Sequence, residues 1–482
     1  MEKNNSVFHN FIMNVILTMS SFIFPLITFP YVSRVLSPVG IGKVSFATSV
    51  VNYFLIIAQL GIPTYGIRAC AKVRDSKEEL NKTVQEILLI SIIMCIVSYV
   101  LFFICIFFVP KFVEEQKLLL VISTMILFTT LGVEWFYKAL EMYSYITWRS
   151  IIFKVIALVA MFILVKKQDD YVIYGAISIF ASSASNILNF VCLHKLVDLK
   201  VHFRLDIRKH MKPILVFFAM SCATTIYLNL DTIMLGFMKT DADVGYYNAA
   251  VKIKNMLVSV VTSLGTVLLP RVTYYLEKGE KAKFEKLAIK ALRFVMFISV
   301  PLLVYFIIFA RQGVLLLSGN EYENAILPMQ FMMPTLLFIG LTNIMGIQIL
   351  VPKGREDKVL VSVIAGAAVD LVLNAILIPK YAATGAAIGT MIAEVVVYIV
   401  QYFTDKELFS RLFHYINPFK FILATGMGAI ASMWVQKLEF NHFICLVLGA
   451  ICFGGVYLIS LLLLKESFIQ EIIATIIKRK RT

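Results

Sequence analysis

Long apolar runs alternate with short polar segments along the whole chain. Continuous apolar stretches of about 20 residues predict membrane-spanning α-helices, because the hydrocarbon core of a bilayer is about 30 Å thick. These runs lack the alternating pattern of a transmembrane β-strand. We therefore predict an all-α integral membrane protein of about fourteen helices. The predicted spans are residues 11–36, 39–64, 83–109, 118–140, 147–167, 171–194, 212–236, 244–270, 284–311, 324–350, 356–379, 382–405, 419–436 and 440–464.

Composition supports a membrane protein and argues against several chemistries. Of 482 residues, 60% are hydrophobic and 16% are charged, whereas soluble domains carry about 25% charged residues. The seven cysteines form no C-x-x-C pair and the six histidines are scattered, so we expect no disulfide framework and no metal site. The sequence also lacks a soluble domain, a nucleophile–base arrangement and a glycine-rich phosphate loop. We therefore expect no catalytic residues, no cofactor, no use of ATP and no enzyme activity.

Basic residues are distributed unevenly between the predicted loops. Lys and Arg concentrate at 68–82, 195–212, 271–293 and in the tail "KRKRT", while loops such as "KTDADVG" and "SGNEYENA" contain few. An even number of helices places both termini on one side, and the excess of Lys and Arg predicts that this side is the cytoplasm. Attraction to anionic lipids accounts for the net charge of +15. Nucleic acid is not an expected partner.

Two pairs of segments indicate an internal duplication. "VGIGKVSFA" is similar to "ADVGYYNAA", aligning Gly42 with Gly245, and "YVIYGAISIF" is similar to "YAATGAAIGT", aligning Tyr171 with Tyr381. The offsets of 203 and 210 residues fit a repeated six-helix unit. We predict an N-terminal lobe at 1–210, a C-terminal lobe at 211–410, and two added helices with a basic tail at 411–482.

Several segments resemble those of a known transporter family. They are "FPYVSRVLSPVGIGKVSFA", "GVEWFYKALEMYSYI", "NLDTIMLGFMKTDADVGYYNAAVKI", "VLLPRVTYY" and "LNAILIPKYAATGAAIGTMIAEVV". They are similar to the bacterial polysaccharide (Wzx/RfbX-like) flippases of the MOP exporter superfamily, which also contains the MATE drug exporters and the lipid II flippases. The resemblance extends over the whole chain. One departure is Asp370, since "AVDLVLN" stands where the family commonly has Asn.

The resemblance implies a fold and a function. The fold would be two six-helix bundles in a V shape, working by alternating access in the bacterial cytoplasmic membrane. The cargo would be undecaprenyl-diphosphate-linked oligosaccharide, and the expected partners are glycosyltransferases and a polysaccharide polymerase. Alternatives are a MATE-like cation exporter, a lipid II flippase and a membrane polysaccharide polymerase. An exporter of cations would favour acids in its first helices, where the sequence has Arg34 and Lys43 instead.

Five basic residues are candidate ligands for the diphosphate. Arginine binds phosphate oxygens with two parallel hydrogen bonds. A cation at membrane depth costs free energy, so a residue of this kind is expected to have a function. For Arg34 and Lys43, beside the first turn, the alternative is that they extend to the membrane interface as anchors. The candidates are Arg34, Lys43, Arg149, Lys252 and Arg271. Arg271 is expected at the inner end of the helix predicted at 244–270.

Charge pairs are candidates for a gate. Glu134, Lys138 and Glu141 have i, i+4, i+7 spacing, which would place them on one helix face. Asp231 and Lys252 lie on either side of the turn at 237–243 and would reach similar depth. Either pair could instead be structural, fixing a helix or a helical hairpin.

Three residues in the C-terminal lobe are candidates for ion coupling. Asp370, Asn374 and Glu394 lie near mid-membrane in the helices predicted at 356–379 and 382–405. A carboxyl group there could take up and release a proton, or the oxygens could bind Na⁺. The driving force would then be an H⁺ or Na⁺ gradient or the membrane potential. The alternative is a neutral, hydrogen-bonded acid with a structural role.

Overall fold

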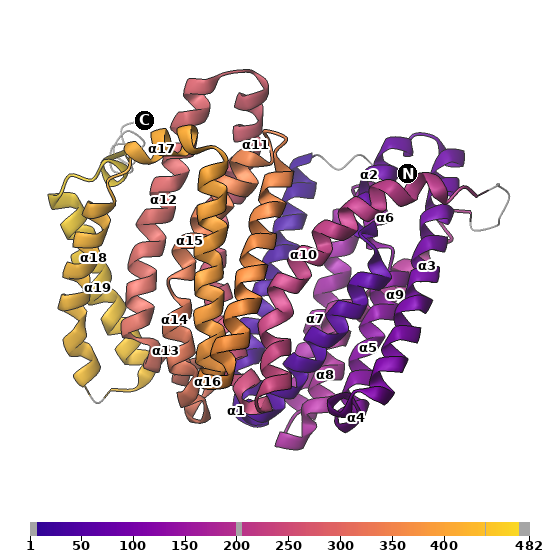
Figure 1. Ribbon diagram of the computed structural model, residues 1–482, viewed down its shortest axis with the longest axis horizontal. Coiled ribbons are helices and arrows are strands. Elements are labelled where there is room, and N and C mark those ends of the chain that lie inside the picture. The colour runs from indigo at the N-terminus through magenta and orange to yellow at the C-terminus, as the bar shows by residue number, and fades with distance from the viewer. Residues whose placement is uncertain (1–6, 199–204, 439, 472–482) are drawn as a thin grey trace. The chain divides into compact units, whose positions relative to one another are not determined.

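The protein is all-helical in the part that the computed structural model describes, residues 7–198, 205–438 and 440–471. The chain forms two compact units, residues 1–245 and 246–482 (Figure 1). Helix α10 (Arg208–Met238) belongs to the first unit. The lobes expected at 1–210, 211–410 and 411–482 stay a prediction. The tail "KRKRT" lies outside the described residues.

The first unit is built around the long helix α1 (Val7–Gln59), which contacts α3, α5, α7, α8 and α10. Its sequence supplies aliphatic and aromatic residues on all faces: the C-terminal half packs among these helices, whereas Ile16, Met19 and Ile23 of the N-terminal half are exposed. The remaining elements are α2 (Ile62–Val73), α3 (Lys77–Phe108), α4 (Pro110–Glu114), α5 (Gln116–Leu131), α6 (Glu134–Ala139), α7 (Tyr143–Leu164), a 3₁₀ turn (Gln168–Asp170), α8 (Tyr171–Ile179), a π-helical turn (Phe180–Ala184), α9 (Asn186–Leu193) and α10.

The second unit begins within α11 (Asp241–Glu277) and has its core around α12 (Lys281–Ile308). Large apolar side chains such as Phe309, Phe409 and Phe421 are fully buried in that core. The other elements are α13 (Ala310–Ser318), a 3₁₀ helix (Asn320–Ala325), α14 (Ile326–Met332), α15 (Thr335–Thr342), a π-helix (Asn343–Leu350), α16 (Glu356–Thr404), α17 (Lys406–His414), α18 (Pro418–Met433), a 3₁₀ turn (Trp434–Lys437) and α19 (His442–Leu463).

Membrane-length helices account for most of both units. Among the described residues, ten helices are long and apolar enough to cross a membrane, or eleven if the bent pair Asn320–Met332 and Thr335–Leu350 is one span. This confirms a multi-pass membrane protein. The predicted number of fourteen is not confirmed: Ile12–Val73 and Glu356–Thr404 each count as one span, although the sequence predicts two in each, and α11 is not among the counted spans.

Breaks in the backbone divide two long helices where the sequence predicts helix ends. Ser37 (φ 58°) interrupts α1 between the spans predicted at 11–36 and 39–64. Ala382 (φ 47°) interrupts α16 at the residue where the span predicted at 382–405 begins, three residues after the end of the one predicted at 356–379. Thr240, between α10 and α11, lies 203 residues after Ser37, which is the offset of the first predicted repeat. One of the two offsets thus recurs in the positions of helix ends, and the internal duplication stays a prediction.

Other breaks differ from the prediction. The span predicted at 118–140 is interrupted at Val133 (φ 38°), where Gly132 packs too closely against Asn186 to accept a side chain. The span predicted at 324–350 bends by 46° beside Pro334, whose ring removes a backbone donor. Arg271 does not end its helix, because α11 continues to Glu277. The prediction ended this helix where its apolar run ends. A polar side chain interrupts the apolar run but does not break the backbone hydrogen bonds, so the helix itself can continue.

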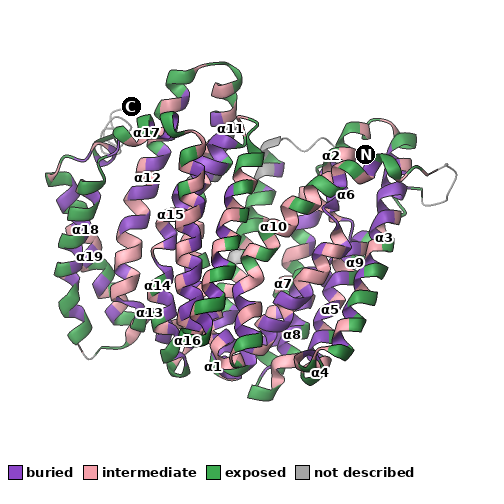
Figure 2. Cartoon of the chain, in the orientation of Figure 1, coloured by how far each residue is buried: buried purple, intermediate pink, exposed green. Residues whose placement is uncertain are grey.

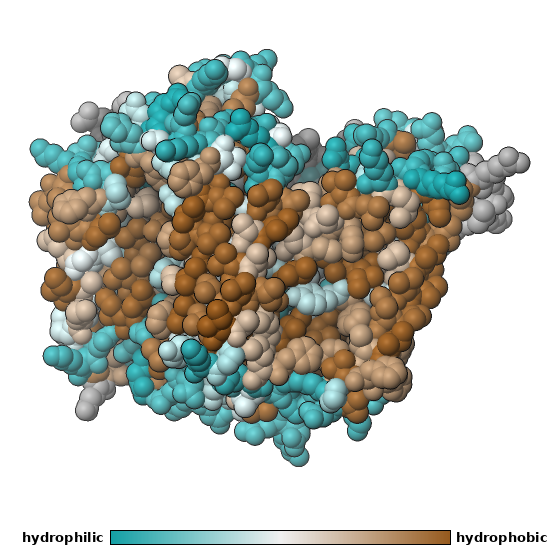
Figure 3. Space-filling view, viewed as in Figure 1, coloured by the Kyte–Doolittle hydropathy of each residue, from teal (hydrophilic) through white to brown (hydrophobic). Residues whose placement is uncertain are grey.

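The surface of each unit matches a lipid environment. Large apolar side chains are widely exposed on both, for example Phe108 at 81% and Ile430 at 75% (Figure 2). On the face shown in Figure 3, hydrophobic residues cover the middle of the helices and hydrophilic residues cover their ends. Such a distribution would be unstable in water and is stable in a bilayer.

Candidate functional site

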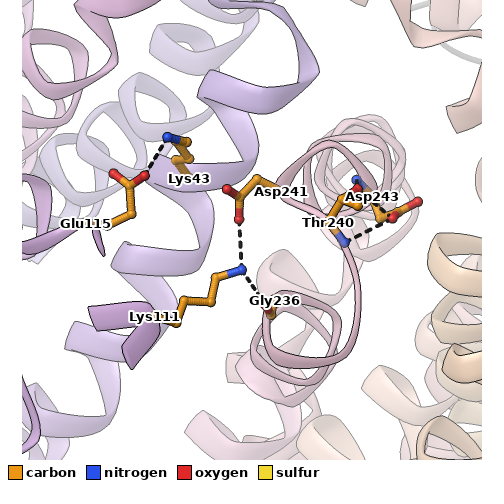
Figure 4. Close-up of polar contacts among 7 residues, drawn as sticks. All are labelled: Lys43, Lys111, Glu115, Gly236, Thr240, Asp241 and Asp243. Carbon is orange, nitrogen blue, oxygen red and sulfur yellow. Dashed lines mark hydrogen bonds and ion pairs between the residues drawn. The ribbon is translucent and has the colours of Figure 1, made fainter. Parts of the chain in front are cut away.

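Two ion pairs of the first unit, Lys43–Glu115 and Lys111–Asp241, lie near two helix turns, the break in α1 at Ser37 and the loop at Thr240. Figure 4 shows both pairs, which we call the clasp. Lys43 of α1 lies 2.5 Å from a carboxylate oxygen of Glu115, and its ammonium group lies 4.8 Å from the ring centre of Tyr171. Lys43, a predicted phosphate ligand, therefore has its charge balanced by an acid on the same unit.

A second ion pair ties α4 to the beginning of α11. Lys111 Nζ lies 2.9 Å from Asp241 Oδ1 and also donates to the carbonyl of Gly236. Thr240 caps the same helix, since its hydroxyl oxygen accepts from the N–H of Asp243 at 3.3 Å, and the Asp243 carboxylate accepts in return from the N–H of Thr240 at 3.2 Å and from its hydroxyl at 2.7 Å. The turn between α10 and α11 is therefore fixed to α4 by the ion pair and to the first residues of α11 by the cap (Figure 4).

The two turns also meet through their backbones. A methyl group added at Gly42 would overlap the carbonyl oxygen of Asp241, and one added at Gly245 would overlap that of Pro38. Only glycine allows this approach, because any β-carbon would occupy the space of the opposing backbone. Gly42 and Gly245 are the residues that the predicted repeat aligns, and they lie on either side of one contact.

Arg34 precedes the break in α1 and is exposed. Its guanidinium group donates to the carbonyl of Pro30, one turn earlier in its own helix. Neither the phosphate role nor the interfacial role of Arg34 is tested by these contacts, and both stay predictions.

Arg149 is buried inside the first unit, only 4% exposed. It donates to the carbonyl of Ser185 at 2.8 Å and lies 3.6 Å from Glu134. Glu134 also pairs with Lys138 at 2.7 Å, at the i, i+4 spacing expected from the sequence. Glu141 does not share their face, because α6 ends at Ala139 and Glu141 (φ 59°) pairs with Arg74 instead.

Lys154 adds a cation that the sequence analysis missed. It donates to the hydroxyls of Ser20 and Ser21, both at 2.9 Å, and interacts electrostatically with Glu134. Glu134 thus faces three cations, Lys138, Arg149 and Lys154, so this cluster carries a net positive charge. The signal that could have identified it is a lysine in the interior of the apolar span predicted at 147–167, away from the basic residues near its two ends.

A second missed group is the buried acid Glu86 on α3. Its carboxylate accepts from His210 Nε2 at 2.8 Å and from the backbone N–H of Asp206 at 2.8 Å, and it pairs with Lys209 at 2.7 Å. The Tyr65 hydroxyl bonds His210 Nδ1 at 2.6 Å. These bonds hold the start of α10 against α2 and α3, so we interpret Glu86 as a structural anchor.

The predicted acidic residues of the second unit lie together on α16. Asp370 and Glu394 are each twelve residues from the break at Ala382, so the two arms place them at similar depth. Asp370, Asn374 and Glu394 are at most 7% exposed. A β-carbon at Gly389 would lie 3.1 Å from Asp370 Oδ1 and would overlap Asn374 Oδ1, so both oxygens lie against its backbone.

Hydroxyl groups adjoin these acids. The Tyr247 hydroxyl lies 3.0 Å from Thr390 Oγ1, one residue after Gly389. Among the residues that the structure describes, no three His, Cys, Asp or Glu residues converge as a metal site. The oxygens that lie against Gly389 belong to one carboxylate and one amide, hard donors that suit a proton or a hard cation.

The other predicted cations are on α11. Lys252 is half-buried and Arg271 is exposed. The pairing expected between Asp231 and Lys252 stays a prediction, since the two residues belong to different units. Asp231 itself is 4% exposed.

Comparison with known proteins identifies similar families and folds. A family model described as "Polysaccharide biosynthesis protein" matches residues 7–276, and one described as "MatE" matches residues 217–377. A protein of Escherichia coli (strain K12) named "Putative O-antigen transporter" is 23% identical over 383 residues, 78% of this chain and 91% of that protein.

Two solved structures share the fold. "Lipid II flippase MurJ, inward closed conformation" aligns with a TM-score of 0.75 at 15% identity, covering 94% of this chain and 100% of that one. A structure titled "Inward-facing conformation of a multidrug resistance MATE family transporter of the MOP superfamily" aligns with a TM-score of 0.63 at 14% identity, covering 85% and 100%.

Proposed function

The chain belongs to the polysaccharide biosynthesis protein family, whose model covers more than half of it, and we propose that it flips lipid-linked oligosaccharide across the membrane. The cargo is an undecaprenyl-diphosphate-linked unit that moves from the inner to the outer leaflet of the bacterial cytoplasmic membrane by alternating access. The termini face the cytoplasm, as the distribution of Lys and Arg predicts. The relative named as an O-antigen transporter supports this class of cargo.

The observation that carries the proposal is the positive cluster around Arg149. A diphosphate brings about two negative charges, which are costly in a low-dielectric interior unless cations meet them. Arg149 and Lys154 are fixed by neutral partners, a carbonyl and two hydroxyls, and share one acid with Lys138. The cluster can therefore accept an anionic head group without first breaking a fully balanced ion pair.

Transport changes no covalent bond, so it needs an external driving force. We assign the coupling to Asp370, Asn374 and Glu394, which would bind H⁺ or Na⁺. The membrane potential is an alternative source, worth about 2.3 kcal/mol per charge at 100 mV. The Arg34, Lys43, Lys252 and Arg271 side chains remain candidate contacts for the head group along its path.

A cation exporter is the second candidate function, because the "MatE" model matches residues 217–377. An exporter of cationic drugs needs acids where its cargo binds, and the cluster in the first unit is positive instead. Lipid II transport would differ only in the glycan. A polymerase would need a site for glycosyl transfer, and two relatives, of Escherichia coli and Shigella dysenteriae, are each named "Putative O-antigen transporter".

Depletion in the producing cells tests the proposal. Loss of the protein should abolish surface glycan and cause lipid-linked oligosaccharide to accumulate, and wild-type protein should reverse both effects. Arg149→Gln keeps a donor for Ser185 but removes the charge, so it should fail to restore export at matched protein levels. Normal surface glycan together with new sensitivity to cationic drugs would favour the exporter instead.

A further inference from the structure

A polar groove lies in the first unit between α1, α2 and α10. Its volume is about 460 Å³, within the range of about 300–1,000 Å³ typical of small-molecule sites. Its polar lining is Asn52, Gln59, Ser221, Thr224, Thr225 and Asn229. None of the residues that line it is charged.

The polar residues form stripes along two membrane-length helices. Ser221, Thr225 and Asn229 follow each other at i, i+4 and i+8 on α10, so they share one face. Asn52 and Gln59 are spaced i, i+7 on α1. A hydroxyl can bond the carbonyl of its own helix, as Thr224 does to Met220, but a side-chain amide such as that of Gln59 facing hydrocarbon would be left unsolvated at a cost of several kcal/mol. These stripes therefore face a hydrated space or a polar ligand.

Hydrogen bonds orient the two asparagine amides. Asn52 Nδ2 donates to Asn229 Oδ1 at 3.2 Å, and Asn229 Nδ2 donates to the carbonyl of Thr225 at 3.0 Å. Each amide has a second N–H and further acceptor capacity. The Asn52–Asn229 bond thus fixes both groups while leaving donors and acceptors for a ligand.

The chemistry of this lining selects among the parts of a lipid-linked oligosaccharide. A diphosphate needs cations, and a polyprenyl tail needs an apolar surface free of amides. Sugar hydroxyls are both donors and acceptors, as amides and hydroxyls are, and their C–H faces suit Leu55, Pro63 and Leu228 in the same wall. We propose that this groove is a saccharide subsite that binds the neutral sugars of the cargo. The proposal rests on the proposed transport function.

Binding measurements on the full-length protein in lipid nanodiscs test the subsite. Two probes are needed: lipid-linked oligosaccharide extracted from the producing cells, and undecaprenyl diphosphate, which has the same lipid and phosphates without the sugar. The double variant Gln59→Leu/Thr225→Val removes an amide and a hydroxyl. We expect about tenfold weaker binding of the glycosylated probe and unchanged binding of the bare one.

Controls separate the subsite from folding and from the transport proposal. Thr124→Val removes a hydroxyl of the same unit that bonds its own helix at the Val121 carbonyl, and it should leave both affinities unchanged. Thr225→Val alone is a nearly isosteric change, and it should weaken binding of the glycosylated probe about threefold. Unchanged binding of that probe by folded variants, or an equal loss for both probes, would overturn the subsite. Wild-type protein that binds neither probe would contradict the proposed function itself.

Discussion

Charged side chains within membrane-length helices carry most of the functional argument at the scale of single residues. Arg149, Asp370 and Glu394 could be selected from the sequence because each interrupts an apolar run, and all three are buried. Lys154 and Glu86 interrupt such runs as well, yet their roles depend on partners distant in the chain, Ser20 and His210. The sequence shows that burying a charge at such positions costs free energy. It does not show which distant residue compensates that cost, because the fold brings the two together.

Arg34 is the residue for which two roles make opposite predictions. If its fork meets the diphosphate, Arg34→Ala should lose about 2 kcal/mol of binding, roughly thirtyfold in transport, and Arg34→Lys should lose part of it. If it anchors the interface, the lysine variant should behave as wild type, because both side chains reach the head groups.

Complementation of cells lacking the flippase measures the effect of the Arg34 variants, with protein levels matched by immunoblot. Arg311→Ala is a matched control, since Arg311 is 57% exposed in a pair with Glu323. Wild-type export by normally expressed Arg34→Ala protein would remove the phosphate role.

At the scale of helices, apolar runs predict where spans lie but not where they break. Ser37 falls between two separately predicted runs and Ala382 falls where one begins, so those breaks were expected. The break at Val133 lies inside one apolar run and depends on the close approach of Gly132 to Asn186. Hydropathy contains no information on such tertiary contacts, so this break could not be found from the sequence.

The Lys111–Asp241 pair should contribute measurable stability to the first unit. Both side chains are about one-fifth exposed, so their attraction is less screened than that of a surface pair. In a double-mutant cycle with Lys111→Ala and Asp241→Ala, we expect a coupling energy of about 1 kcal/mol.

The same cycle on Arg311 and Glu323, which are both 57% exposed, should give a coupling near zero. Unfolding of the purified protein in detergent, followed by denaturant, supplies the free energies. Equal coupling for the two pairs would mean that the clasp is no stronger than an ordinary surface contact.

For the whole molecule, the proposal separates two tasks between the two units. Cations that meet the head group lie in the first unit, and the acidic residues assigned to coupling lie on α16 of the second. The sequence predicted the acids on α16 but not a strict division, since its candidate cations Lys252 and Arg271 belong to the second unit. It could not predict the polar groove, because Asn52 and Asn229 come together only when α1 packs against α10.

Neutralising the coupling residues should separate binding from driven transport. Asp370→Asn and Glu394→Gln keep the shape of each side chain and remove its charge. If either acid carries the coupling ion, its variant should bind cargo as the wild-type protein does but should no longer transport faster when an ion gradient is imposed. Thr404→Val is the control, since Thr404 lies on the same helix and its hydroxyl bonds the carbonyl of Val400 in that helix. Unchanged dependence on pH and Na⁺ in both acidic variants would exclude these residues from coupling.

Movement of cargo between leaflets by the purified protein is the most direct test of the central claim. The protein is reconstituted into vesicles that contain lipid-linked oligosaccharide labelled on its glycan, and the label exposed outside is followed with time. We predict that label crosses the bilayer faster in these vesicles than in protein-free ones, and faster still under an imposed H⁺ or Na⁺ gradient or membrane potential. Crossing at the protein-free rate by folded, correctly inserted protein would contradict the account.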